Sequence, residues 1–274
     1  MLSFPNCKIN IGLNIVQKRS DGFHDLETIF YPVPFYDVLE IIRDNDAQTG
    51  NHYTFTTSGI AINTENENNI CIKAYNLVIN YIQSLPSLKV HLHKNIPTGA
   101  GLGGGSADGA FMLRMLNEKF ELGMSTEQLM DLALQLGSDC PFFIKNTSCY
   151  AEGRGEKMTP IALDLSGYCI VLVNPGIHIS TAKAFSLVQP RKPANNLRQL
   201  IQLPVKDWKD AVINDFEKPV MQLYPAIDHV KKSLYTHGAL YASMTGSGST
   251  VFGLFSKNVA ISFSENYFVK KILL

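Results

Sequence analysis

The chain has 274 residues, 45% of them hydrophobic, and its 24 basic side chains balance its 24 acidic ones. This length and apolar content are enough to bury a full core and predict two domains. Zero net charge argues against nucleic acid or an acidic membrane surface as a partner, and no apolar run is long enough to span a bilayer. Charged and polar residues appear by Lys8, so we expect no signal peptide, and five cysteines without a C-x-x-C pair predict reduced thiols, no zinc site and a cytoplasmic location.

The first predicted element is a strand over residues 7–16, where apolar and polar residues alternate at the start. Lys8 and Asn10 then project from one face, which is either a solvated edge or part of a site. Asp21-Gly22 predicts a turn. From the pattern alone, His24 after this turn is equally well explained as a surface histidine or as a binding residue.

The next elements are read from the same periodicities. Alternation predicts strands over residues 38–43 and 53–57. A polar, turn-like segment over 63–69 precedes a predicted helix over 70–85, and a further strand is expected over 88–93. These strands and this helix lead into the most unusual stretch of the chain.

That stretch, residues 97–107 and hereafter the phosphate loop, reads Pro-Thr-Gly-Ala-Gly-Leu-Gly-Gly-Gly-Ser-Ala. Glycines so dense fill no core, and they suit a backbone that takes positive φ repeatedly or approaches a ligand closely. A helix is predicted over 107–116 with Ser106 at its N-cap, so unpaired N–H groups and the helix dipole would face a phosphate. The alternative is a flexible linker or hairpin.

Two familiar phosphate-binding patterns do not fit. Gly99, Gly101 and Gly104 satisfy G-x-G-x-x-G, but the strand that should follow the helix is missing. In its place Ser125 and Gln128 form a capping box that opens another helix, over 126–136. The Walker pattern fails because no Lys-Ser or Lys-Thr pair closes the loop.

Asp139 follows this helix in a Ser-Asp-Cys-Pro segment, where Pro141 predicts an extended Cys140 and a stiff support for the aspartate. Asp139 is either a cap or turn residue or a functional acid. An apolar strand is predicted over 167–174, and helices over 208–237. Residues 239–255 predict two strands joined by a glycine–serine turn.

The phosphate loop resembles the signature P-x-x-x-G-L-G-G/S-S/G-S/A-A of the GHMP kinase superfamily, and the 244–254 turn resembles its third motif. The resemblance implies an α+β fold in two domains. Residues 1–155 would form the ATP-binding domain, with a ribosomal-S5-domain-2-like mixed sheet and helices. Residues 156–274 would form a ferredoxin-like α/β sandwich, with a final helix abbreviated in a short tail.

Two further segments resemble one branch of that superfamily. These are Arg19-Ser-Asp-Gly-Phe-His and Pro175-Gly-Ile-His-Ile-Ser-Thr, which add to the Cys7-Lys-Ile-Asn-Ile strand. The branch phosphorylates the C2 hydroxyl of 4-diphosphocytidyl-2-C-methyl-D-erythritol in the non-mevalonate route to isoprenoid precursors. The resemblance implies ATP and Mg²⁺, a small cytidine-diphosphate-linked substrate, no nucleic acid or membrane partner, and a monomer or weak homodimer.

The family's residue roles carry over as follows. Asp139 would be the catalytic base, with Lys8 beside it. The ATP site would comprise Asn69 and Lys94 near the adenine, and the loop residues Pro97, Thr98, Gly99, Ala100, Gly101, Leu102, Gly103, Gly104, Gly105, Ser106 and Ala107. The substrate site would comprise Asn10, Phe23, His24, Phe30, Thr181, Phe185, Gly246 and Gly248, with Phe23 and Phe185 enclosing the cytosine.

Some assignments stay open on the sequence. Asn69 and Lys94 are also ordinary polar residues at element ends. No residue is assigned as a metal ligand, although Ser106 is a candidate contact for Mg²⁺. The role of Asp108 is open, since an acid in the first turn of the helix suits the dipole but opposes a phosphate, so it either faces away or touches the metal.

Three other functions compete with this reading. Another GHMP kinase, of the homoserine or mevalonate type, would share the loop without needing the cytosine pocket. A non-catalytic sugar-nucleotide-binding relative would keep the fold, although retention of both Lys8 and Asp139 argues against it. A dinucleotide-binding protein is disfavoured by the missing strand.

Overall fold

The computed structural model describes residues 1–45, 53–62, 65–82 and 85–274. By their contacts the residues group into two units, neither of them continuous in sequence. Unit 1 comprises residues 1–7, 35–98 and 103–146, and unit 2 comprises residues 8–34, 99–102 and 147–274. The predicted domain boundary after residue 155 does not coincide with this grouping and stays a proposal. Residues 63–64 of the predicted polar segment and 83–84 of the predicted helix lie outside the described residues.

Unit 1 contains a four-stranded sheet in the order β1-β4-β6-β5. Its strands are β1 (Leu2–Ser3), β4 (Val38–Arg43), β5 (Tyr53–Gly59) and β6 (Leu88–Lys94). β6 pairs antiparallel with β4 and parallel with β5. The strands predicted over 38–43, 53–57 and 88–93 are therefore confirmed, with the last two slightly longer than predicted.

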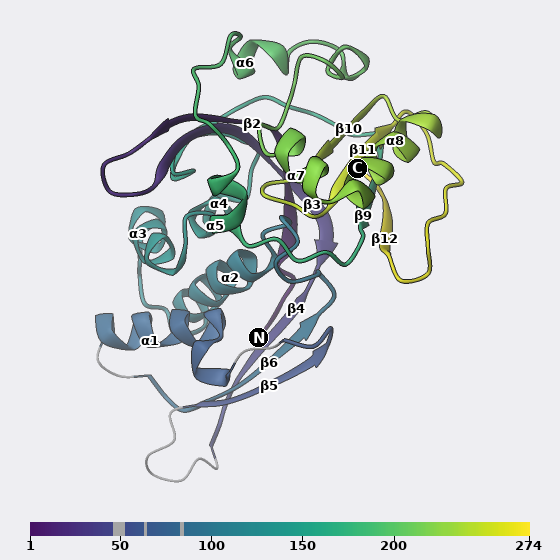
Figure 1. Ribbon diagram of the computed structural model, residues 1–274. Helices are drawn as coiled ribbons and strands as arrows, with labels where there is room; N and C mark the ends of the chain where they lie inside the picture. Colours follow the sequence, from purple (N-terminus) through teal and green to yellow (C-terminus); the bar gives the residue numbers. More distant parts are fainter. Residues whose placement is uncertain (46–52, 63–64, 83–84) are drawn as a thin grey trace. The chain divides into compact units, whose positions relative to one another are not determined.

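Helices pack beside this sheet in unit 1 (Figure 1). They are η1 (Asn66–Asn68), α1 (Ile70–Ile82), α2 (Gly104–Lys119), α3 (Thr126–Leu136) and α4 (Cys140–Lys145). α2 contacts α1, α3, α4 and strand β4, so the helix after the phosphate loop is the centre of the unit. The predicted capping box is present, because Ser125 N donates to Gln128 Oε1 at 2.8 Å and Gln128 N donates to Ser125 Oγ at 3.3 Å.

Two local predictions, the N-cap at Ser106 and the extended conformation of Cys140, were wrong. α2 begins at Gly104 with Gly103 at the N-cap in a left-handed conformation (φ 70°), so Ser106 lies inside the first turn. A Cβ on Gly104 would lie 2.8 Å from the Ile96 side chain, so close packing favours glycine within this turn. Cys140 is the first residue of α4 and is not extended, because a proline in the first helical turn loses no hydrogen bond.

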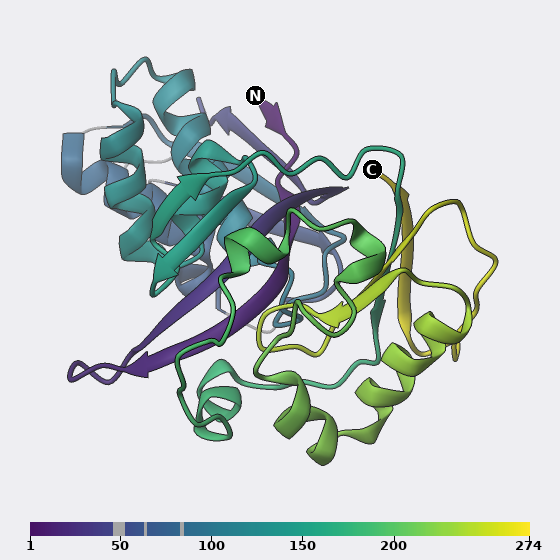
Figure 2. The same cartoon turned by 90° about the horizontal axis from the view of Figure 1, so that it is seen from above.

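Unit 2 contains most of a sheet with the order β2-β3-β7-β8. Its strands are β2 (Asn6–Lys18), β3 (His24–Tyr36), β7 (Cys149–Gly153) and β8 (Lys157–Pro160). Figure 2 shows β2 and β3 as two long purple strands side by side. The turn between them is closed by Arg19 N, which donates to Phe23 O at 2.8 Å.

The other sheet of unit 2 has the order β10-β11-β9-β12. Its strands are β9 (Cys169–Asn174), β10 (Tyr241–Met244), β11 (Val251–Phe255) and β12 (Phe268–Leu273). β10 and β11 are antiparallel, which confirms the predicted pair of strands around the glycine–serine turn. The expected abbreviated final helix was wrong, because the tail instead forms β12 and pairs antiparallel with β9.

The helices of unit 2 are α5 (Thr181–Ser186), α6 (Leu197–Leu200), η2 (Val205–Asp207), α7 (Glu217–Leu223) and α8 (Pro225–Thr236). α8 contacts α7, β10 and β11, and the lime-green helices are seen beside these strands in Figure 2. Helix was predicted from 208, but Asn214 forms a parallel β-bridge with Leu13. Leu13 N donates to Ile213 O at 2.9 Å and Asp215 N donates to Leu13 O at 2.8 Å, so this segment pairs with the edge of β2.

All five cysteines lie in the described part of the chain, where each is buried and none forms a disulfide. Burial raises the pKa of the Cys71 thiol and raises that of Cys140 to about 12. Within the described ranges, no helix combines the length and the apolar character needed to cross a membrane.

Candidate active site

The phosphate loop takes the left-handed backbone conformation at Gly99, Gly101 and Gly103, with φ of 64°, 79° and 70°. This confirms the prediction that its glycines serve repeated positive φ. At Gly101 there is also no room for a side chain, because a Cβ would lie 2.1 Å from Thr245 O. The backbone of the loop therefore packs directly on the third motif within unit 2.

The Thr245 hydroxyl joins strand β2, at Asn10, to the phosphate loop. It accepts a hydrogen bond from Asn10 N at 3.0 Å and donates one to Gly101 O at 3.0 Å. Lys8 N donates to Leu102 O at 2.9 Å, which ties the start of β2 to the same loop. Three segments far apart in the sequence thus meet around one buried threonine.

Lys8 and Asn10 are each 3% exposed, so the alternative of a solvated edge is wrong. Lys8 Nζ donates to Asn10 Oδ1 at 2.5 Å and lies 5.0 Å from the centroid of the Phe30 ring. Asn10 Nδ2 in turn donates to Thr28 Oγ1 at 3.0 Å. Thr28 was not among the residues predicted from the sequence. It lies on β3 between the predicted pocket residues His24 and Phe30, and this position could have pointed to it. The carboxamide of Asn10 therefore fixes the direction of the ammonium group.

The predicted cytosine pocket is built differently from expectation. His24 and Phe185 stack with ring centroids 4.6 Å apart and an interplanar angle of 16°. Phe23 is 48% exposed, and the Arg154 guanidinium lies 4.0 Å from its ring centroid. Phe185 thus stacks on His24 and meets the Phe216 ring edge-on at 5.0 Å, while Phe23 lies under Arg154. Burial and, secondarily, the charge of Lys18 lower the pKa of His24, which keeps its ring neutral near pH 7.

The remaining predicted substrate residues lie on α5 and in the third motif. Thr181 opens α5, and its hydroxyl oxygen is 3.5 Å from Ser247 Oγ. Gly246 and Gly248 both have positive φ, at 56° and 90°. These residues place small polar groups and bare backbone at the end of β10, within the same unit as Lys8.

Asp139 belongs to unit 1, at the N-cap position of α4. It is half-buried and its side chain makes no capping hydrogen bond, which weighs against the simple cap alternative. The neighbouring Cys140 thiol is buried and hydrogen-bonds the Ser106 side chain. Asp139 therefore directly precedes a buried residue that ties α4 to the first turn of α2.

A buried ion cluster underlies the loop in unit 1, and sequence reasoning did not foresee it. Lys94 Nζ pairs with Asp37 Oδ2 and with Asp108 Oδ2, the latter at 2.6 Å. All three side chains are at most 2% exposed. Asp37 Oδ1 accepts from the backbone N–H groups of Asn95 and Ile96 at 2.6 and 2.9 Å. The cluster links the end of β6 to α2.

This cluster answers the question of Asp108 and corrects the role of Lys94. Asp108 turns inward onto Lys94, so its charge is not presented to a phosphate. The Lys94 side chain is 1% exposed and its ammonium group is paired with two aspartates, which argues against the predicted adenine contact. Asn69 Oδ1 accepts from Cys71 N at 2.9 Å, so this predicted adenine residue caps α1.

The cluster predicts an unusual dependence of stability on pH. Burial, with a further contribution from Asp37 and in spite of Lys94, raises the pKa of Asp108 from 3.8 to about 8. The folded protein therefore holds a proton that the unfolded chain has released, and stability is lost as pH rises from about 4 to about 8. Asp108→Asn, which mimics the protonated acid, is expected to lessen this loss.

Urea unfolding of both proteins near pH 5 and near pH 9 checks this expectation. The free energy of unfolding of Asp108→Asn relative to wild type should increase with pH. A constant difference across that range would contradict the inward, protonated Asp108.

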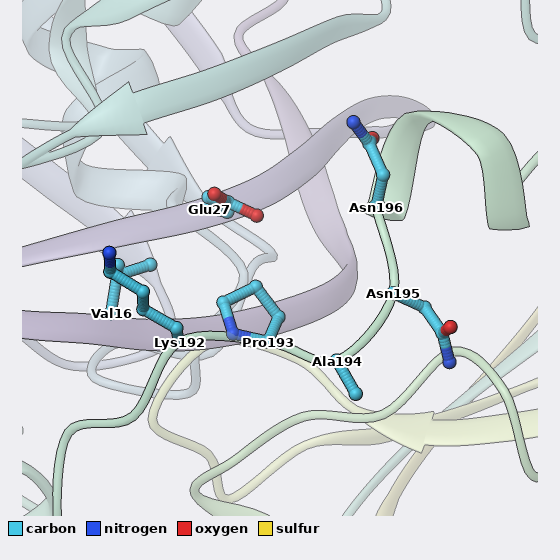
Figure 3. A pocket seen from close by; sticks show the side chains of 7 residues that line it. All are labelled: Val16, Glu27, Lys192, Pro193, Ala194, Asn195 and Asn196. Carbon is cyan, nitrogen blue, oxygen red and sulfur yellow. The ribbon is translucent and has the colours of Figure 1, made fainter.

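Within the described ranges, no group of three His, Cys, Asp or Glu side chains is placed to hold a metal ion. A pocket of about 330 Å³ lies in unit 2 between β2, β3 and residues 192–196 (Figure 3). Its lining includes Glu27, which alternates along β3 with His24 and Thr28 and so points to the opposite face of that strand. None of the predicted site residues lines this pocket.

Comparison with known proteins agrees with the resemblance to the GHMP kinases. Residues 69–146 match the GHMP kinases N terminal domain, and residues 193–267 match the GHMP kinases C terminal family. A 4-diphosphocytidyl-2-C-methyl-D-erythritol kinase of Bacteroides fragilis (strain YCH46) is 51% identical over 262 residues, which cover 96% of this chain and 94% of that protein. The chain belongs to the 4-diphosphocytidyl-2-C-methyl-D-erythritol kinase branch of the GHMP kinases.

Other members of this kinase branch and solved GHMP kinases extend the comparison. The relative from Cytophaga hutchinsonii is 44% identical and covers 97% of this chain and 96% of that protein. A crystal structure of 4-(cytidine 5'-diphospho)-2C-methyl-D-erythritol kinase matches with a TM-score of 0.81 at 28% identity, covering 94% of this chain and 91% of that chain. Mevalonate kinase of Methanococcus jannaschii, at 12% identity and a TM-score of 0.69 over 100% of this chain and 98% of that one, shares the fold. The predicted α+β GHMP kinase fold is confirmed.

Proposed function

We propose that this protein transfers the γ-phosphate of ATP to the C2 hydroxyl of 4-diphosphocytidyl-2-C-methyl-D-erythritol. It is an ATP-dependent phosphotransferase of the non-mevalonate route to isoprenoid precursors. The observation that carries the proposal is the 51% identity to the Bacteroides fragilis kinase over 96% of the chain. We further propose that it acts in the cytoplasm as a monomer or weak homodimer.

The chemistry needs a group that removes the proton of the substrate hydroxyl as the oxygen attacks the γ-phosphorus. We assign this general base to Asp139, whose half-buried carboxylate is not used to cap α4. A positioned base contributes on the order of 10²–10⁴ in rate. The short, packed α4 gives this carboxylate a fixed support.

Lys8 is assigned to charge stabilisation. Its ammonium group is buried and directed by Asn10, so it keeps one orientation without reorganisation when negative charge builds up on the attacking oxygen. The phosphate loop supplies backbone N–H groups and the start of α2 to the phosphates of ATP. Because these groups hold the phosphates in place, the phosphates need little further ordering before the reaction.

Mg²⁺ would neutralise the phosphates in this reaction, and this cation usually keeps water and phosphate oxygens as most of its ligands. Asp108 is excluded as a ligand by its inward pairing with Lys94. The hydroxyl of Ser106, in the first turn of α2, is the side chain we assign to the cation.

The decisive test is consumption of ATP with the cytidylyl alcohol, compared with homoserine and mevalonate under the same conditions. We expect turnover with the cytidylyl substrate alone. Preference for homoserine or mevalonate would assign the chain to another GHMP activity. Tight binding of the cytidylyl alcohol without any turnover would favour a non-catalytic relative.

Phe185→Ala is expected to weaken binding of the cytidylyl substrate by about 1–3 kcal/mol and leave ATP binding unchanged, because an aromatic face contributes this much to stacking on a base. Calorimetric titration of each ligand measures the two affinities. Phe263→Ala, which truncates another partly buried ring of unit 2, is the matched control. Equal losses for both ligands would contradict the pocket assignment.

A further inference from the structure

Asn214 lies in the extended segment before α7, and neither the motifs nor the family resemblance gives it a function. Its side chain is buried, with 3% of the residue exposed. Asn214 Nδ2 donates to Met244 O at 2.8 Å and to Gly246 O at 2.9 Å. Its Oδ1 accepts from Phe216 N at 2.9 Å. One carboxamide thus donates hydrogen bonds to two carbonyl groups of the third motif.

The residue between those two carbonyls is Thr245, whose hydroxyl joins Asn10 N to Gly101 O. The turn that follows contains Gly246 and Gly248, both with positive φ, and such a turn has many accessible backbone conformations. Because Asn214 holds the carbonyl groups of the two residues that flank Thr245, it fixes the position of the threonine hydroxyl. It therefore acts on the phosphate loop through Thr245, without touching the loop itself.

Contacts of the neighbouring residues Asp215 and Glu217 hold Asn214 and the end of β10 in place. Glu217 Oε1 accepts from Met244 N at 2.7 Å, and Lys231 Nζ pairs with Glu217 Oε2 at 2.7 Å. On the other side, Asp215 Oδ2 accepts from Ile15 N at 2.9 Å, so the same segment is anchored to β2. The strand that carries Lys8 and Asn10 and the end of β10 are both held by the segment around Asn214.

We infer that Asn214 is a positioning residue, which sets the affinity for the triphosphate by holding Thr245 against Gly101. The inference rests on the proposed function, since it takes the loop to be the ATP site. It assigns no chemistry to Asn214. It predicts that loss of the carboxamide's donor harms ATP binding much more than binding of the cytidylyl group, whose predicted rings, His24 and Phe185, stack on each other.

The sharpest variant is Asn214→Ser. A serine at this position keeps an acceptor for Phe216 N, as in an ST turn, but cannot span both carbonyls. We expect the Kd for ATP, measured by calorimetry, to rise at least about tenfold, as for the loss of one to two net hydrogen bonds. The Kd for cytidine 5'-diphosphate should stay within about twofold of wild type.

Two further variants separate positioning from plain loss of stability. Tyr241→Phe removes another buried hydrogen bond of unit 2, from Tyr241 Oη to Val212 O at 3.0 Å, and leaves the third motif's carbonyls paired. It should lower Tm without changing the Kd for ATP. Asn214→Asp keeps the shape of the side chain but loses the donor, and it must show the same split between ATP and cytidine diphosphate as Asn214→Ser.

A wild-type Kd for ATP in either Asn214 variant, or an equal loss in Tyr241→Phe, would overturn the inference. The direct binding measurement also keeps it separate from the proposed function. If the wild-type protein binds ATP but phosphorylates no cytidylyl alcohol, the proposed function fails while the inference about Asn214 is still decided by the ATP affinities.

Discussion

Replacement of Asp139 by alanine is expected to lower kcat at least about 100-fold while ATP affinity stays close to that of the wild type. The reason is that a carboxylate acting as general base matters in the transition state and contributes little to binding of the nucleotide. Asp139 stands at the N-cap of α4, where its side chain makes no capping hydrogen bond. Steady-state kinetics with the cytidylyl substrate, together with calorimetry for ATP, measure the two effects.

Asp131→Ala is the matched control, since Asp131 is an exposed acid on α3 in the same unit. It should leave kcat, KM and Tm unchanged. If Asp139→Ala retained wild-type kcat, or lost ATP affinity to the same degree as kcat, the assignment of the base would fail.

Gly101→Ala is expected to abolish measurable ATP binding and to lower activity at least about 100-fold, as small displacements of catalytic geometry do. A Cβ at this position would lie 2.1 Å from Thr245 O, and the residue has φ of +79°, which costs an alanine about 1–2 kcal/mol. The loop and the third motif must therefore move apart. Circular dichroism during thermal unfolding would report a lower Tm, and calorimetry would report the lost affinity.

Gly105→Ala tests the same loop from the opposite direction. Gly105 lies in the first turn of α2, its φ is not left-handed, and nothing lies within 4 Å of a Cβ there. Alanine should therefore stabilise the fold by about 0.5–1 kcal/mol. If phosphates rest on this turn, the added methyl group will still raise the Kd for ATP. An unchanged Kd would show that the triphosphate does not approach Gly105.

The sequence predicted best those elements whose patterns are local. The alternation in residues 38–43 gave β4 its bounds, and the capping box of Ser125 and Gln128 placed the start of α3. The dense glycines correctly predicted positive φ in the phosphate loop. In each case, neighbours within a few residues decide the conformation, so the linear pattern contains the needed information.

Features that depend on distant partners could not be read in this way. The position of Lys94 before the loop placed it near the adenine, and the role of Asp108 stayed open, but Asp37, far away in sequence, forms a buried cluster with both. The stack of His24 on Phe185 likewise requires two segments to meet. The tail forms a strand because β9 offers it a pairing edge, which no pattern within residues 261–274 reveals.

Because all five cysteines are buried and free, their reaction with alkylating reagents reports local unfolding of the protein. Alkylating reagents react with exposed thiolates, so each thiol can be modified only when the structure around it transiently opens. Cys71 and Cys140 lie in unit 1, whereas Cys149 and Cys169 lie in unit 2. Mass spectrometry of peptides after timed alkylation of the wild-type protein would thus show whether the two units unfold together or one before the other.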